Sequence, residues 1–173
     1  MSESLSILFV CTGNICRSPM AERIGRGYAA DAGVAVDFSS AGVGAINGQP
    51  MHPYSVEVLE GHGSDASDFA SRYLRMPMVT SADVVLALTR EHRAACQQLA
   101  PARWKRSFTL VEFVDLASAG SIDDIITARV GTDVNAERLD ILDPMGQPRE
   151  DFERLYTEVE PLVRQVVDWA GRG

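Results

Sequence analysis

One segment constrains the fold of this chain more than any other: an apolar strand pattern runs into a short polar loop and then into a helix start. Residues 7–10, Ile-Leu-Phe-Val, form a continuous apolar run that favours a buried parallel strand. Ser18-Pro19 is typical of the first turn of a helix. A loop in this position points backbone N–H groups inward at the positive end of a helix dipole. The segment therefore predicts a strand–loop–helix unit that binds an anion.

The side chains of this loop suit phosphoryl transfer. A cysteine, five spacers, an arginine and a hydroxyl residue follow one another. A helix N-terminus and a nearby arginine stabilise a thiolate, which attacks phosphorus readily. Arg17 offers a planar fork for two phosphoryl oxygens, and Ser18 can hydrogen-bond the thiolate of Cys11. We predict hydrolysis through a phosphocysteine, with the phosphate or another oxyanion held by Thr12, Gly13, Asn14, Ile15, Cys16, Arg17 and Ser18.

Charge and cysteine content narrow the class of protein. The net charge of -8 argues against a nucleic-acid partner. The sequence has no run of 18 apolar residues and no basic secretory signal, so we expect no membrane association. Three cysteines, two of them in the loop, favour a reducing, cytoplasmic setting over a disulfide framework. We expect a monomer.

Strand and helix patterns alternate along the chain. The patterns predict strands at 7–10, 35–40, 83–88 and 108–111, and helices at 18–31, 54–60, 90–99 and 150–170. Such alternation predicts an α/β fold with one parallel sheet covered by helices on both faces. Ligands of these sheets bind beyond the carboxyl ends of the strands, where Cys11 stands.

Several positions carry more specific expectations. Residues 115–140 are predicted to form a long loop or a small helical insertion within a single domain that spans 1–173. Pro161 is expected to bend or break the last helix, because proline cannot donate the helical hydrogen bond. His92 stands between charged residues on a predicted helix, so we expect it to be solvated.

A second candidate site residue lies just before the last helix. Asp143 precedes Pro144, which restricts its backbone to extended conformations, and Gly146 and Pro148 keep the stretch irregular. A carboxyl group projecting from such a loop over a cleft can protonate a leaving oxygen and then activate water. The alternative is an aspartate that only initiates a turn.

The loop and the Asp143-Pro144 pair together resemble the low-molecular-weight protein tyrosine phosphatases. Residues 7–22 match the start of that family almost one for one, and residues 40–42 and 82–88 are also similar. The resemblance implies a three-layer fold with a four-stranded parallel sheet, no metal or organic cofactor, and a phosphorylated protein or peptide as substrate.

The resemblance also assigns roles to single residues. It implies that Cys11 is the nucleophile, Arg17 the phosphate-binding arginine and Asp143 the general acid. It places Asn14, Ser18 and Ser40 in a hydrogen-bond network that holds the loop. Cys16 matches a cysteine that traps the oxidised nucleophile as a disulfide and so protects it from over-oxidation. The alternative for Cys16 is a small buried hydrophobic residue.

Some positions depart from the family pattern and bear on the substrate. Met145-Gly146 and residues 45–48 hold no aromatic side chain where phosphotyrosine enzymes usually carry one. A His-Ala-Arg-like stretch is replaced by residues 68–71, which predicts altered surroundings for Asn14. The related protein arginine phosphatases share the loop but tend to place Thr before the second cysteine. Ile15 stands there in this chain and favours an aryl ring over a planar polar guanidinium.

We therefore predict a protein tyrosine phosphatase, with protein arginine phosphatase as the first alternative. The loop after the second strand and residues 108–112 resemble the arginine enzymes. Thioredoxin-coupled arsenate reductases use two further cysteines near the third strand, and here only Cys96 is available, on a predicted helix. A non-catalytic phosphate-binding module would lack a catalytic residue, and all are present. The histidines have no metal-ligand spacing, so no metal site is predicted.

Overall fold

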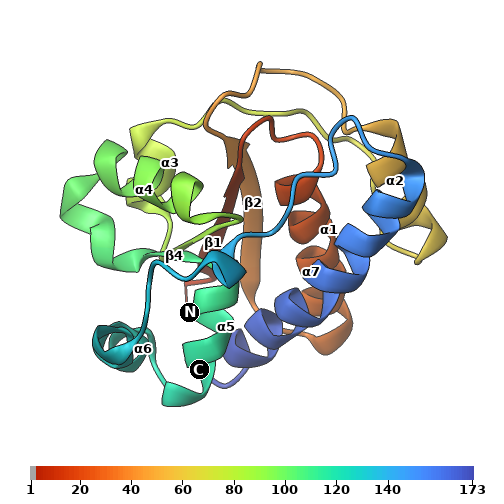
Figure 1. Cartoon of the computed structure of the whole chain (residues 1–173). Coiled ribbons are helices and arrows are strands. Elements are labelled where there is room, and N and C mark those ends of the chain that lie inside the picture. The colour runs from red at the N-terminus through yellow and green to blue at the C-terminus, as the bar shows by residue number, and fades with distance from the viewer. Residues whose placement is uncertain (1–2) are drawn as a thin grey trace.

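The computed structural model describes residues 3–173 (Figure 1). Strands and helices alternate through the first two thirds of the chain, and a long helix closes it. The strands are β1 Leu5–Cys11, β2 Val36–Gly42, β3 Val84–Ala87 and β4 Ser107–Thr109. The helices are α1 Arg17–Ala32, α2 Pro53–Gly61, α3 Met76–Ser81, α4 Arg90–Leu99, α5 Leu110–Leu116, α6 Ile122–Ala128 and α7 Arg149–Ala170.

The four strands form one parallel sheet in the order β2-β1-β3-β4. The chain passes from β1 to β2 on one side and then returns to β3 on the other, so the order reverses beside β1. Cys11 ends β1 at this point, in register with Gly42 of β2. Parallel sheets bind ligands where the strand order reverses. The predicted α/β class and the four-stranded parallel sheet are confirmed.

The two faces of the sheet are covered by different helices (Figure 1). Ile7 and Phe9 of β1 belong to a large core that includes residues of α1, α2, α5 and α7. Leu8 and Val10 belong to a smaller core with residues of α3 and α4. Alternate residues of a strand point to opposite faces, so the continuous apolar run of β1 fills both cores.

The predicted end of the fourth strand was wrong, and one helix was missed. The strand expected to reach Val111 ends at Thr109. The Thr109 hydroxyl accepts a hydrogen bond from the backbone N–H of Glu112, and the Glu112 carboxylate accepts one from the N–H of Thr109, both at 3.1 Å. This capping box starts α5 at Leu110. Helix α3 was not predicted at all, because six residues carry too short a pattern.

Pro161 does not break the last helix, although a bend or a break was expected there. Helix α7 runs without interruption from Arg149 to Ala170 with Pro161 inside it. Both Pro161 and Thr157, four residues earlier, lie on the exposed side of the helix. The carbonyl that proline leaves without a partner is therefore open to water, while Phe152, Val159 and Val163 pack into the core on the other side.

The segment 115–140 contains local helical structure. Helix α6 begins with a capping box in which the Ser121 hydroxyl accepts from the N–H of Asp124 at 3.3 Å. Short 3-10 turns follow at Arg129–Gly131 and Glu137–Leu139. Ile125 and Leu139 are buried, so the segment is attached to the body of the molecule rather than free of it.

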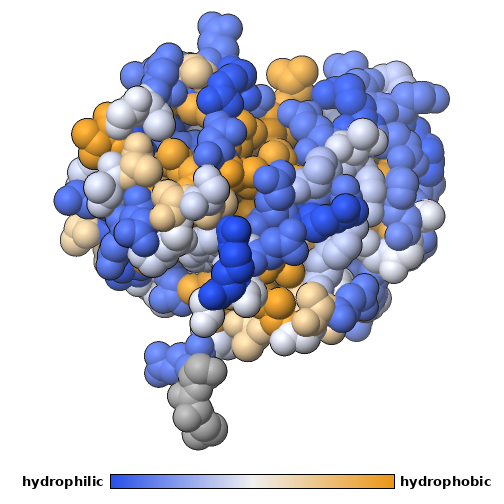
Figure 2. All heavy atoms as spheres, turned by 90° about the horizontal axis from the view of Figure 1, so that it is seen from below, coloured by the Kyte–Doolittle hydropathy of each residue, from blue (hydrophilic) through white to orange (hydrophobic). Residues whose placement is uncertain are grey.

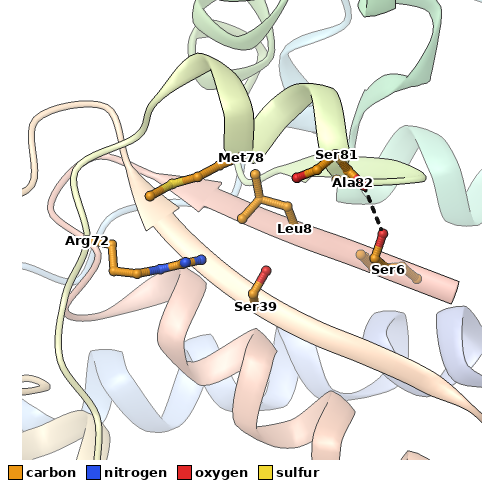
Figure 3. A pocket seen from close by; sticks show the side chains of 8 residues that line it. Ser6, Leu8, Ser39, Arg72, Met78, Ser81 and Ala82 are labelled. Carbon is orange, nitrogen blue, oxygen red and sulfur yellow. Dashed lines mark hydrogen bonds between the residues drawn. The ribbon is translucent and has the colours of Figure 1, made fainter. Parts of the chain in front are cut away.

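The surface offers a small cavity and a mostly hydrophilic exterior. A cavity of about 130 Å³ lies beneath α3. Figure 3 shows Met78 and Ser81 of α3 near Leu8 of β1 and Ser39 of β2, which also line it. Hydrophilic residues dominate the face seen in Figure 2, with hydrophobic residues showing between them. No helix among the described residues is both long and apolar enough to cross a membrane.

Candidate active site

The loop between β1 and α1 is held in a shape that needs particular residues. Asn14 adopts a left-handed backbone conformation with φ of 54°, which asparagine tolerates better than most residues. The backbone after β2 wraps the loop, since Val43 and Gly44 donate to the carbonyls of Cys11 and Thr12, each at 2.9 Å. A Cβ on Gly42 would lie 2.4 Å from the Thr12 carbonyl oxygen, so only glycine fits there.

The side chain of Asn14 orients the Ser18 hydroxyl that contacts the Cys11 sulfur. Its amide nitrogen donates to the Ser18 hydroxyl oxygen at 2.8 Å. The Ser18 oxygen lies 2.9 Å from the Cys11 sulfur. Because the Ser18 oxygen already accepts from Asn14, its own proton is free to point at the sulfur. The arrangement suits a thiolate on Cys11.

The network continues to a buried carboxylate. Asn14 donates its second amide proton to the Ser40 hydroxyl at 2.9 Å, and Ser40 donates to Glu22 at 3.0 Å. Glu22 also pairs with Arg23 at 3.0 Å. The predicted association of Asn14, Ser18 and Ser40 is therefore present in the structure. Sequence reasoning missed Glu22, although its spacing of four residues from Ser18 placed it on the same helix face.

Arg17 lies almost completely buried at the start of α1. One guanidinium nitrogen donates to the backbone carbonyl of Ile141 at 2.9 Å. The other nitrogen lies 3.4 Å from the Thr12 hydroxyl oxygen and 3.5 Å from an Asp143 carboxylate oxygen. These contacts hold the fork of Arg17 at the mouth of the loop and bring two predicted site residues together across 126 positions of sequence.

Asp143 stands in an open loop between the 3-10 turn Glu137–Leu139 and α7. Its side chain is 48% exposed, and its second contact besides Arg17 is a hydrogen bond from the N–H of Met145 at 3.0 Å. This local turn orients the carboxylate without burying it. Ile141 ties the base of the loop to the sheet, because its N–H donates to the Leu88 carbonyl at 2.9 Å.

His92 contradicts the expectation that it is solvated. The residue is 3% exposed, and Nε2 lies 2.8 Å from the Thr12 hydroxyl oxygen. Thr89 caps α4 by accepting from the N–H of His92 at 3.2 Å, and this turns the first helical turn toward the catalytic loop. Burial, followed by the charge of Arg17, lowers the pKa of His92 to about 4. The ring is therefore neutral at physiological pH.

Arg72, directly after the stretch 68–71 that departs from the family pattern, contacts Asn14 and Ser40. Its backbone N–H donates to the side-chain Oδ1 of Asn14 at 2.9 Å, and its Nε donates to the backbone carbonyl of Ser40 at 3.1 Å. In Figure 3 its side chain extends beside Ser39 of β2. A bridge between Gly42 and Tyr73 brings this segment against the sheet. The side-chain amide of Asn14 thus has partners on both of its polar atoms.

The cysteines are all free in the structure. Cys16 is buried at the end of the loop, where α1 begins, and burial, followed by the nearby charges of Asp143 and Cys11, raises its pKa to about 12. Cys96 is completely buried on α4 among apolar residues, as the packed-residue interpretation expected, and burial likewise raises its pKa to about 12. Both thiols are therefore protonated at neutral pH.

Aliphatic side chains are exposed on the segments that border the loop. Ile46 follows β2, and Leu142 and Met145 flank Asp143; their exposed fractions are 69%, 65% and 44%. The backbone of Ile46 is fixed because its carbonyl accepts from Ser71 at 2.5 Å. The mouth of the site thus has apolar borders without an aromatic ring from these positions.

Known proteins are similar to this chain in both sequence and fold. Residues 6–128 match the family model of low molecular weight phosphotyrosine protein phosphatases, which is well over half of the chain. The chain belongs to this family. A protein-arginine-phosphatase of Bacillus subtilis is 34% identical over 94% of each chain. A probable low molecular weight protein-tyrosine-phosphatase of Ralstonia nicotianae is 33% identical over 96% of this chain and 94% of its own length.

A solved structure confirms the arrangement of the elements. The low molecular weight protein tyrosine phosphatase from T. tengcongensis superposes with a TM-score of 0.78 at 33% identity, over 95% of this chain and 99% of that one. By family this chain is accordingly a hydrolase, a protein phosphatase. The relatives include both tyrosine and arginine phosphatases, so the family alone does not choose the substrate.

Proposed function

We propose that this chain hydrolyses phosphotyrosine in proteins or peptides through a phosphocysteine intermediate. The observation that carries the proposal is the meeting of Cys11, Ser18, Arg17 and Asp143 at one mouth, with sulfur–hydroxyl and guanidinium–carboxylate separations of 2.9 and 3.5 Å. The Cys11 thiolate attacks phosphorus while the phenolic oxygen leaves. Asp143 gives its proton to that oxygen, and Arg17 with the loop N–H groups stabilises the equatorial oxygens.

In the second step water replaces the cysteine. Asp143, now a carboxylate, removes a proton from water as its oxygen attacks the phosphorus of phosphocysteine. The P–S bond breaks, phosphate departs and the Cys11 thiolate returns. The Ser18 hydroxyl stabilises the departing thiolate, because Asn14 keeps the Ser18 proton directed at the sulfur. Thr12, Gly13, Ile15 and Cys16 complete the proposed phosphate-binding loop.

The aliphatic borders favour a phosphoryl group carried on an aryl ring. Ile46, Leu142 and Met145 are exposed beside the loop and offer apolar contact to the ring. Ile15, within the loop, crowds a planar polar guanidinium and suits a ring. A phosphoarginine side chain needs polar partners for its remaining N–H groups, and a buried donor without a partner costs about 1–3 kcal/mol.

The test compares kcat/KM for a phosphotyrosine peptide and a phosphoarginine peptide of the same sequence, with Cys11→Ser as the blank. We expect the ratio to lie well above one. Ile15→Thr is expected to lower the ratio, because it removes the crowding of the guanidinium by the isoleucine side chain. The matched control is Val43→Thr, a comparable change outside the loop. A ratio well below one assigns this chain to the arginine phosphatases, which the 34% identical Bacillus subtilis relative represents.

We also propose that Cys16 protects the nucleophile from irreversible oxidation. A peroxide oxidises the Cys11 thiolate to a sulfenic acid, and the Cys16 thiol displaces its hydroxyl as water to form a disulfide. The position of Cys16 in the same loop supports this role. After brief peroxide treatment and thiol reduction, the wild type should regain activity, whereas Cys16→Ser should stay inactive. Equal recovery of both would leave Cys16 as a packing residue.

We further propose a monomer that acts in the cytoplasm and has no nucleic-acid partner. The free state of all the cysteines supports a reducing compartment, and the net charge of -8 opposes binding to phosphate backbones. Sedimentation at micromolar concentration tests the oligomeric state, and fractionation of cells tests the location.

A further inference from the structure

A groove separate from the active site lies between α4 and the segment that follows α6. It encloses about 720 Å³, and none of its lining residues belongs to the catalytic loop or to the loop of Asp143. Its walls come from α4, from the turn Pro101–Arg106 and from residues 126–135. A volume of this size matches that of small-molecule sites in proteins.

The groove is positively charged on a chain whose net charge is -8. Arg93, Lys105 and Arg129 line it, and no Asp or Glu is among its lining residues in the described chain. Glu112 pairs with both arginines, at 2.9 Å to Arg93 and 2.5 Å to Arg129. Two guanidiniums therefore share one carboxylate, which leaves one positive charge uncompensated in a cluster that is more than nine-tenths buried.

Arg129 also has an unused donor. Its Nη1 is buried and has no hydrogen-bond partner, although Nη2 donates to the Ser107 carbonyl at 3.0 Å. The guanidinium packs 4.5 Å from the centre of the Phe108 ring. Because Nη1 is buried, it is not itself open to the groove, and an anion there would act on the excess charge of the cluster.

Apolar side chains stand beside these charges. Val130 is 89% exposed and Trp104 is 49% exposed, and both line the groove. The Lys105 ammonium lies 5.8 Å from the centre of the Trp104 ring, so one cation and one aromatic face adjoin. A neutral apolar molecule would leave the excess charge uncompensated, and a small inorganic anion would leave the indole and Val130 in water.

We propose that this groove is a second binding site for a small organic anion, with one acidic group on an aromatic or aliphatic body. The acidic group lies toward Arg129 and Lys105, and the body covers Trp104 and Val130. The site is separate from the catalytic loop, so a test of this proposal does not depend on the proposed phosphatase reaction.

The test is a fluorescence titration of the full chain with 8-anilinonaphthalene-1-sulfonate, an aromatic anion of this class, in saturating orthovanadate. We expect saturable binding of one dye per chain. The uncharged N-phenyl-1-naphthylamine should bind about tenfold more weakly or worse, because it lacks the charge. Displacement of the sulfonate dye by vanadate would place it at the catalytic loop and overturn the proposal.

Variants locate the site. Val130→Asp and Lys105→Met change exposed side chains and are each expected to raise the Kd about tenfold. Met76→Asp on α3, an exposed apolar residue outside the groove, adds the same charge as Val130→Asp and should leave the Kd unchanged. Arg129→Met should also weaken binding, with folding checked by circular dichroism. Equal affinities of Val130→Asp and Met76→Asp would overturn the proposal.

Discussion

The catalytic loop and the loop of Asp143 contact the same Arg17 but are held in opposite ways. In the catalytic loop, Asn14 and Ser18 are completely buried and joined by hydrogen bonds of 2.8–2.9 Å. Asp143 is about half exposed and is oriented by one guanidinium and one backbone N–H.

This contrast follows from what each loop must do in the proposed reaction. The phosphate-binding groups stabilise charge best when they are fixed before the reaction, because no reorganisation is then needed. A general acid must reach both a leaving oxygen and a water, and it keeps its proton exchange with solvent through exposure. The comparison predicts that substitutions in the buried loop cause large losses of activity. Substitutions in the exposed loop should cause losses that depend on the leaving group.

The largest effect is expected at the nucleophile. Cys11→Ser should lower kcat by at least about four orders of magnitude, because a serine hydroxyl is not ionised here and the covalent step fails. Vanadate binding should persist, since Arg17 and the backbone N–H groups remain. The measurements are single-turnover hydrolysis and vanadate titration. Substantial residual turnover would mean that the buried loop binds phosphate but does not supply the nucleophile.

The exposed loop should show a smaller loss that depends on the substrate. Asp143→Asn should slow phenyl phosphate about 10²–10³-fold, because a poor leaving group needs a proton. It should slow an activated aryl phosphate, such as 4-nitrophenyl phosphate, much less. The measurement is kcat across a series of leaving groups. An equal loss across the series would remove the acid role from Asp143 and weaken the contrast between the loops.

Removing the amide that supports the buried loop should cost activity and stability together. Asn14→Ala loses the bonds to Ser18, Ser40 and the Arg72 N–H, and it places alanine at a φ of 54°. We expect kcat/KM to fall about 10–100-fold and the Tm to drop, since the left-handed conformation alone costs about 1–2 kcal/mol.

A matched control is Asn47→Ala, which loses one bond to the N–H of Tyr73 outside the catalytic loop. Steady-state kinetics and thermal unfolding of both variants check the expectation. If the two variants lost activity equally, the rigidity of the catalytic loop would not depend on the Asn14 network.

The smallest effect concerns the pH dependence that His92 contributes to stability. Its pKa is about 4 in the folded chain and about 6.5 when unfolded, so below pH 6.5 the unfolded state binds more protons. Stability is then fully present above pH 6.5 and is lost as pH falls toward 4. Between pH 7 and pH 5 this amounts to about 2 kcal/mol.

Urea unfolding of the wild type and of His92→Gln at both pH values isolates this contribution. Glutamine keeps a hydrogen-bonding group for the Thr12 hydroxyl but cannot titrate, so the variant should lose about 2 kcal/mol less on acidification. Identical losses in the two proteins would mean that the ring is accessible to protons in the folded state, and that α4 is not fixed against the catalytic loop.

Local contacts could be predicted from the sequence more fully than contacts between distant residues. Cys11, Arg17 and Ser18 lie within one strand–loop–helix unit, so their spacing and the helix start sufficed to predict their association. Asp143 was predicted by its Asp-Pro setting and by family resemblance, and the structure places it 3.5 Å from Arg17. His92 was wrongly predicted as solvated, because its charged sequence neighbours say nothing about which helix face meets another element.

The sequence by itself determined the alternation of strands and helices, the position of the anion-binding loop at a strand end, and the candidate catalytic residues, because these depend on short-range pattern and local conformation. Only the tertiary structure decided that His92 meets Thr12, that Arg72 supports Asn14, and that Arg93 and Arg129 share Glu112. Burial and ion pairing arise where elements pack, and the residues that meet there are separated by 17 to 80 positions. No local pattern specifies which side chain will face which, so these contacts follow from the packed fold.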